Sequence, residues 1–212
     1  MPVIILPTTY LGPISYYKYL VNSPVVIEQH AFYVKQTYTN RCEIATANGV
    51  ENLTIPVEHG ASKLAIKDVK ISEHSNWQTL HWRAIETAYN STPFFEYYKE
   101  DLRPFFEQEF TSLLDFNLQI QNTILDLLGF DSKVTLSDSY QEKYNSGEID
   151  LREALHPKKK LVPLGVHLEH QKYYQVFNNK FGFVPDLSII DLLFNMGNEA
   201  RLILKNNKDG NN

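Results

Sequence analysis

The sequence predicts an α/β domain in which a small sheet, including an antiparallel hairpin, is packed with several helices. Short β-branched runs near the N-terminus are separated by a helical segment, and amphipathic helical segments follow one another in the middle of the chain. An Asn-Gly pair at 48–49, between two extended runs, is a strong hairpin signal. An α+β arrangement is the alternative that these observations leave open.

Length and composition favour one domain. The chain has 212 residues, so we expect a single domain over 1–204 and a disordered tail at 205–212. A net charge of −5 offers no overall basic field for nucleic acid. A single cysteine fits a reducing compartment. Pro7 and Pro13 interrupt the first apolar run well short of a membrane span, so we expect a cytoplasmic protein without membrane insertion.

The first third of the chain is predicted to be mostly extended. Residues 3–6 and 25–28 are short apolar strands, and residues 14–20 form a helix between them. The hairpin occupies 41–57, with its turn at the Asn-Gly pair. Residues 65–71, AIKDVKI, alternate apolar and polar side chains, which predicts a half-buried strand.

The middle of the chain is predicted to be helical. Ser75 and Gln78 form a capping-box pattern, after which apolar residues recur at helical spacing up to a Ser-Thr-Pro step. Residues 94–110 predict two short helices that are broken before their internal proline. A further helix starts near Asp115 and stops at Gly129.

A short apolar helix carries one carboxylate. Residues 185–197, PDLSIIDLLFNMG, predict a buried helix that ends at Gly197. Asp191 lies inside it, where a carboxylate is costly to bury unless a cation or several donors meet it. Asp191 is therefore either a structural partner in the core or a general base or orienting carboxylate. Asn195, four residues later, lies on the same face.

One histidine is also expected in the core. His81 lies on the apolar stripe of its helix, between Trp77 and Ile85. It is either a core histidine whose ring nitrogens both have partners, or an acid–base group beside a carboxylate such as Asp191.

The stretch VKQTYTNRCEI, 34–44, gathers candidate ligand-binding residues. Arg41 offers a planar fork to a carboxylate or phosphate, and Lys35 offers a point charge. Asn40 adds a polar amide, and pairing of Arg41 with Asp191 is the structural alternative. Cys42 suits the inward face of a strand, where a thiol is inert, and a nucleophilic role in a Cys–His arrangement is the alternative.

The usual motifs of catalysis and metal binding are missing from the sequence. His167 and His170 do not complete a tetrahedral set, so we expect no metal site, and Lys158, Lys159 and Lys160 are expected in a solvated loop. No Walker loop, dinucleotide glycine pattern or GxSxG elbow occurs. The cofactor remains unknown at this level.

Four segments in succession carry a family resemblance. They are VIEQHAFYVKQTYTNRCEIATANGVENLTIPV, IKDVKIS, WQTLHWRAIETAYNSTPFFEYY and FGFVPDLSIIDLLFNMG. Together they resemble the WbqC-like protein family, in order from about residue 3 to 200. The segment LPTTYLGPISYY departs from the QPYFFPYIGYF-like opening of the family. The matching polar residues are Lys35, Asn40, Arg41, His81, Ser188, Asp191 and Asn195.

The resemblance implies a role in bacterial surface-polysaccharide synthesis, including O-antigen synthesis. It suggests acyl or aminoacyl transfer to a small-molecule substrate, a nucleotide-linked amino sugar. Lys35 and Arg41 would then hold phosphate or carboxylate, with Asn40, Ser188 and Asn195 also binding substrate. His81 would accept the proton of the attacking amine, and Asp191 would orient His81. A non-catalytic sugar-binding module in a glycan-assembly complex and a purely structural polar set are the alternatives. The donor, the sugar and the oligomeric state stay open.

Overall fold

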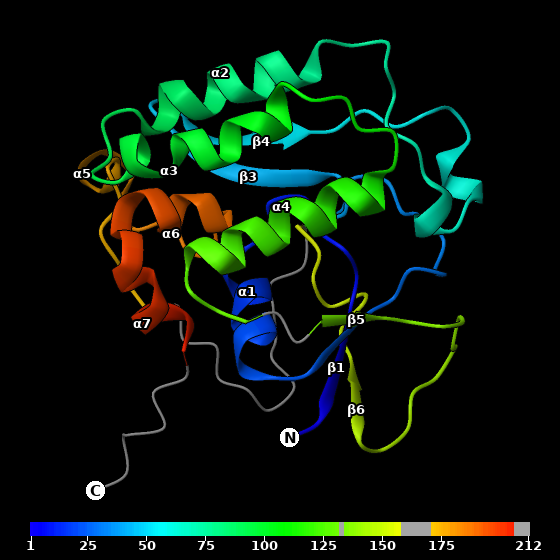
Figure 1. The fold of residues 1–212 in the computed structure, drawn as a ribbon. Helices are drawn as coiled ribbons and strands as arrows, with labels where there is room; N and C mark the ends of the chain where they lie inside the picture. Colours follow the sequence, from blue (N-terminus) through cyan, green and yellow to red (C-terminus); the bar gives the residue numbers. More distant parts are fainter. Residues whose placement is uncertain (132–133, 158–170, 206–212) are drawn as a thin grey trace, which may run out of the picture.

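The computed structural model describes residues 1–131, 134–157 and 171–205 (Figure 1). Its strands are β1 (Val3–Leu6), β2 (Val25–Ile27), β3 (Arg41–Thr46), β4 (Gly49–Thr54), β5 (Val134–Leu136) and β6 (Glu148–Asp150). Its α-helices are α1 (Ile14–Asn22), α2 (Trp77–Tyr89), α3 (Phe95–Leu102), α4 (Leu113–Leu127), α5 (Asn178–Phe181), α6 (Ile189–Met196) and α7 (Ala200–Leu204). Short 3₁₀ turns are η1 (Ala61–Lys63), η2 (Ile66–Asp68), η3 (Arg103–Phe106) and η4 (Gly197–Glu199).

The structure confirms the predicted α/β class. A four-stranded sheet has the order β5-β2-β1-β6, and each neighbouring pair is parallel. Helix α1 connects β1 to β2, and Ile4 pairs with Val25 in register. The predicted hairpin forms β3 and β4, but it is a separate antiparallel sheet. The hairpin packs against α2 and α6, away from the parallel sheet in the lower half of Figure 1.

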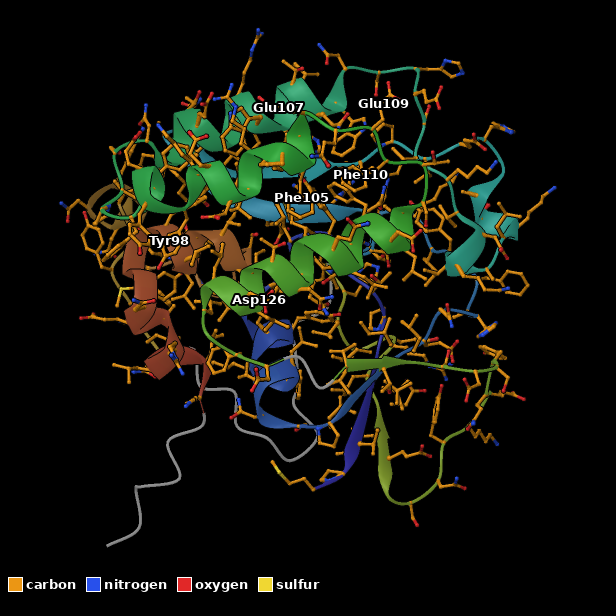
Figure 2. The ribbon with its side chains drawn as sticks, viewed as in Figure 1. Tyr98, Phe105, Glu107, Glu109, Phe110 and Asp126 are labelled. Atoms are coloured by element: carbon orange, nitrogen blue, oxygen red, sulfur yellow. The ribbon has the colours of Figure 1, made fainter. Side chains whose placement is uncertain are left out.

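Aromatic side chains fill the space between the helices. Phe116 of α4 is fully buried and makes edge-on contacts with the rings of Trp77, Phe105 and Phe110. Phe105 of η3 and Phe110, both labelled in Figure 2, lie against α4 and stack with ring centroids 6.0 Å apart. Much of the chain's aromatic content therefore serves the core.

Helix α4 has the boundaries that its sequence predicts. The hydroxyl of Ser112 accepts a hydrogen bond from the backbone N–H of Asp115, which caps the first turn. Gly129 follows the last turn with a φ of 67°, a left-handed conformation that favours glycine.

Two local predictions are wrong. Residues 65–71 form η2 and isolated bridges instead of a strand, because their backbone groups pair with irregular segments, as when Ile71 N–H donates to Thr111. The Ser75 capping box does not form, since Asn76 precedes α2 and no side chain caps it. The amide of Gln78 instead donates to the carbonyls of Phe105 and Gln108.

Some predictions fall outside the described residues. The lysine run at 158–160, His167, His170 and residues 206–212 are among them. Within 1–131, 134–157 and 171–205, no helix is long and apolar enough to cross a membrane.

Candidate functional site

Asp191 lies at the centre of a buried hydrogen-bond network on α6. It is fully buried, and its Oδ2 accepts a 2.5 Å hydrogen bond from the Tyr173 hydroxyl and a 3.3 Å hydrogen bond from Nε2 of Gln175. The Tyr89 hydroxyl of α2 also interacts with the Asp191 carboxylate and with the backbone of Ala45. We call Asp191, Tyr173, Gln175 and Tyr89 the Asp191 network.

The donors of this network are neutral. Within the described part of the chain, no lysine or arginine pairs with Asp191. Burial therefore raises the pKa of Asp191 to about 6, although the hydrogen bonds from Tyr173 and Gln175 and the nearby Tyr89 hydroxyl oppose the shift. A carboxylate with this pKa is mostly ionised at neutral pH and can still take a proton, as a general base must.

Two cavities flank the network. The first, which we call the Lys18 pocket, includes Tyr173, and the second, the Val50 pocket, includes Gln175. The Lys18 pocket is lined by Ile14, Ser15, Lys18, Gln171, Tyr173, Phe183, Asp186 and Ile203. The Val50 pocket is lined by Ala45, Gly49, Val50, Gln175, Phe177, Phe181, Gly182 and Val184. Two donors to Asp191 thus each reach the wall of a cavity.

The Lys18 pocket combines a cation with a helix start. Its volume is about 10 Å³, room for about one water molecule. Burial lowers the pKa of Lys18, while the charge of Asp186 opposes the shift. The Asp186 carboxylate accepts 2.8 Å hydrogen bonds from the backbone N–H and the hydroxyl of Ser15. It therefore occupies the start of α1, where a doubly wound nucleotide-binding protein would place a phosphate.

Ser188 and Asn195 hold the segments around Asp191. The Ser188 hydroxyl donates to the carbonyl of Leu11 at 2.7 Å. The amide of Asn195 donates to the backbone carbonyl of Asp191 at 2.7 Å and accepts from the N–H of Val176 at 3.1 Å. Both side chains join α6 to other segments of the chain.

His81 lies in a different part of the core. Its Nδ1 is 2.9 Å from the Tyr10 hydroxyl, and its ring also bonds to the backbone of Thr54. Burial lowers the pKa of His81 to about 4, and the bond to Thr54 opposes the shift. In the described part of the chain, no hydrogen bond joins His81 to Asp191. The catalytic role of His81 stays a prediction, and its surroundings are those of a core histidine.

The residues of the 34–44 stretch lie outside both cavities. Lys35 is exposed, whereas Asn40 is buried and donates to the carbonyl of Ile55 at 2.8 Å. Arg41 is half-buried at the start of β3, where its Nε donates to the Thr54 hydroxyl at 3.2 Å, and it does not pair with Asp191. Cys42 is buried, which raises the pKa of its thiol and makes it a poor nucleophile.

Four residues of this region were not predicted from the sequence: Tyr89, Tyr173, Gln175 and Lys18. Tyr173 and Gln175 are two positions apart, so in an extended segment they lie on one face. This spacing could have predicted that the two side chains act together, but it does not reveal which buried group they contact. Tyr89 could not be distinguished by sequence from the many other aromatic residues of the chain.

The fold and the site define an α/β protein with a buried acid between two cavities. A family model described as the WbqC-like protein family matches residues 8–163, so the chain belongs to the WbqC-like protein family, as its sequence predicted. The uncharacterized protein Rv1507c of Mycobacterium tuberculosis is 27% identical over 191 residues, covering 79% of this chain and 81% of that protein. No solved structure gives a significant match. The family match ends before Tyr173, so it does not bear on α6.

Proposed function

We propose that this protein is a cytoplasmic enzyme of bacterial surface-polysaccharide precursor synthesis, which transfers an acyl or aminoacyl group to a nucleotide-linked amino sugar. Membership of the WbqC-like family supports the polysaccharide context that the resemblance implies. The observation that carries the catalytic part is Asp191, a buried acid with a pKa of about 6 whose donors Tyr173 and Gln175 each line a cavity.

The proposed step is an acyl transfer to an amine. The sugar amine attacks the carbonyl carbon of an activated acyl donor, a thioester or an acyl phosphate, and forms a carbon–nitrogen bond. The bond from that carbon to sulfur or phosphate oxygen breaks, and the leaving group keeps the electron pair. The proton released by the amine passes to the oxygen of Tyr173 as the Tyr173 proton passes to Asp191.

The other polar residues have supporting roles in this proposal. Lys18, beside Tyr173, supplies a positive charge near an anionic part of the substrate. Ser188 and Asn195 act as positioning residues because they hold the segments around Asp191.

The roles predicted for Lys35, Asn40, Arg41 and His81 are separate hypotheses. Lys35, Asn40 and Arg41 stay predicted substrate ligands at a second location, outside the two cavities. We assign proton acceptance to Asp191 because its pKa of about 6 lies closer to neutral pH than that of His81, which burial lowers to about 4, and the role of His81 stays a separate prediction.

The test separates catalysis from binding. Binding of UDP-glucosamine is followed by thermal shift, since a ligand of the folded state raises the melting temperature. Turnover is followed by release of free thiol from the acetyl and butyryl thioesters of coenzyme A. We expect Asp191→Asn to keep the thermal shift and to lose turnover by about 100-fold or more.

The matched control is Asp126→Asn, because Asp126 is exposed on α4, where Figure 2 labels it. This variant should behave as the wild type in both assays. Binding of UDP-glucosamine without turnover in the wild type would instead favour the sugar-binding module. Unchanged turnover in Asp191→Asn would remove Asp191 from the mechanism.

A further inference from the structure

The Val50 pocket has an apolar lining. It lies between the turn end of the hairpin, at Ala45 and Val50, and the segment from Gln175 to Val184. The side chains on its walls are aliphatic or aromatic except for Gln175. A wall of this kind favours a hydrocarbon group, because a polar group placed there would lose its hydrogen bonds to water.

The side-chain N–H groups of Gln175 are all used within the protein. Its Nε2 donates to the Tyr173 hydroxyl at 2.9 Å, to the Val184 carbonyl at 2.8 Å and to Asp191 at 3.3 Å. Its Oε1 accepts from the Val184 N–H at 2.9 Å. The single polar side chain in the wall therefore offers no free N–H group to a ligand, and the apolar remainder of the wall selects for apolar shape.

The volume limits the size of the ligand. The cavity measures about 130 Å³. An apolar cavity of about 150 Å³ in another protein holds one benzene molecule. The Val50 pocket is thus suited to a group of about four to six carbon atoms, and a long fatty acyl chain does not fit inside it.

The pocket is held in place and lies next to the Asp191 network. The ammonium of Lys180, on α5, donates to the carbonyl of Ala47 at 2.6 Å and ties α5 to the hairpin (Figure 1). At the inner wall, the backbone of Ala45 interacts with the Tyr89 hydroxyl, and Gln175 bonds to Asp191. A group that fills the pocket therefore meets Gln175, which is hydrogen-bonded to the buried acid.

We propose that the Val50 pocket binds the hydrocarbon part of the transferred group, a short aliphatic or single-ring acyl group of about four to six carbons. The inference deepens the proposed function, and it rests on that function for the transfer itself but not for binding. It selects a short hydrophobic acyl donor over a glycyl donor and over a long-chain donor.

Binding is tested without any reaction, using butyramide, acetamide and octanamide as probes in saturation-transfer NMR. Val50→Phe narrows the mouth of the pocket, and because Val50 is 48% exposed the fold should tolerate the change. Val34→Phe is the matched control, since Val34 is 58% exposed and does not line the pocket. We expect butyramide to bind the wild type and Val34→Phe equally, and Val50→Phe about tenfold more weakly.

Three results would overturn the inference: no butyramide binding to the folded wild type, equal binding to Val50→Phe, or tighter binding of octanamide than of butyramide. Failure of the proposed function looks different. Butyramide would then bind as expected, while no thioester would acylate UDP-glucosamine. Conversely, transfer at equal rates from butyryl and octanoyl thioesters, unaffected by Val50→Phe, would keep the transferase and remove the pocket from it.

Discussion

The Tyr173 hydroxyl donates a 2.5 Å hydrogen bond to Oδ2 of Asp191 inside the core, so a buried carboxylate is stabilised by a neutral donor. Hydrogen bonds to the charged form lower a carboxyl pKa, whereas burial raises it, and here burial has the larger effect. The balance leaves Asp191 able to change its charge close to neutral pH.

Asp191 should make the stability of the protein depend on pH. Its pKa is raised on folding from 3.8 to about 6, so the stabilisation is complete below the unfolded pKa and is lost as the pH rises through 6. In Asp191→Asn, the side chain at position 191 carries no charge at any pH. Relative to the wild type, the free energy of unfolding of this variant should therefore increase by up to about 3 kcal/mol as the pH rises from about 4 to 7. Urea unfolding at both pH values measures this, and a constant difference would contradict it.

Removal of the Tyr173 hydroxyl should raise the pKa of Asp191 further. Tyr173→Phe deletes a donor to the charged form, and it leaves Asp191 less satisfied, so we expect a loss of about 1–3 kcal/mol in unfolding free energy at neutral pH. Tyr174→Phe is the matched control because Tyr174 is 57% exposed. Equal urea midpoints for the two variants would show that the hydrogen bond does not stabilise the charged form.

His81→Ala should act on stability rather than on binding. The ring is buried beside Tyr10 and Trp77, so its removal leaves a cavity and an unpaired hydroxyl, with an expected loss of about 2–4 kcal/mol. His74→Ala, at an exposed position, should be close to wild type. Normal stability of His81→Ala with lost turnover would restore the catalytic interpretation.

The wild type should also lose stability in acid because of His81. Its pKa falls on folding from 6.5 to about 4, so the stabilisation is present above 6.5 and is lost as the pH falls through 4. His81 alone accounts for up to about 3 kcal/mol over that range.

The sequence predicted the fold class, the hairpin and the apolar helix around Asp191 because each depends on local patterns. It could not predict that the hairpin forms a separate sheet, since strand pairing is decided by contacts far apart in the chain. It identified Asp191 as buried and in need of partners. It could not identify Tyr173 or Gln175 as those partners, because a tyrosine in an aromatic-rich chain gives no sign of which buried group it meets.

Arg152 should be more important for stability than a surface arginine. Its guanidinium bonds to both carboxylate oxygens of Asp150, at 2.9 and 2.6 Å, and lies 3.9 Å from Glu28, which is fully buried. Arg152→Ala leaves Glu28 with one partner fewer, and we expect a loss of about 1–3 kcal/mol in unfolding free energy. Arg103→Ala breaks the surface pair with Glu107 and should change the urea midpoint little. Equal effects would contradict this account.

Gly197 should be harder to replace than Gly60. Both have positive φ, 53° and 87°, but a Cβ on Gly197 would lie 2.7 Å from the Phe94 ring, whereas a Cβ on Gly60 meets nothing within 4 Å. Gly60→Ala should cost about 1 kcal/mol for its backbone conformation alone, and Gly197→Ala should cost clearly more. Thermal unfolding of the two variants compares them directly, and equal melting temperatures would contradict the close approach to Phe94.

The proposed role of Asp191 requires a carboxyl pKa close to neutral pH. Carboxyl carbon NMR of protein labelled at aspartate measures its pKa directly, with the signal assigned by its loss in Asp191→Asn. We expect a titration midpoint near pH 6, set by burial against the neutral donors Tyr173 and Gln175. A midpoint below about pH 4, as in an exposed aspartate, would show that Asp191 is a permanently charged core group and not a proton acceptor.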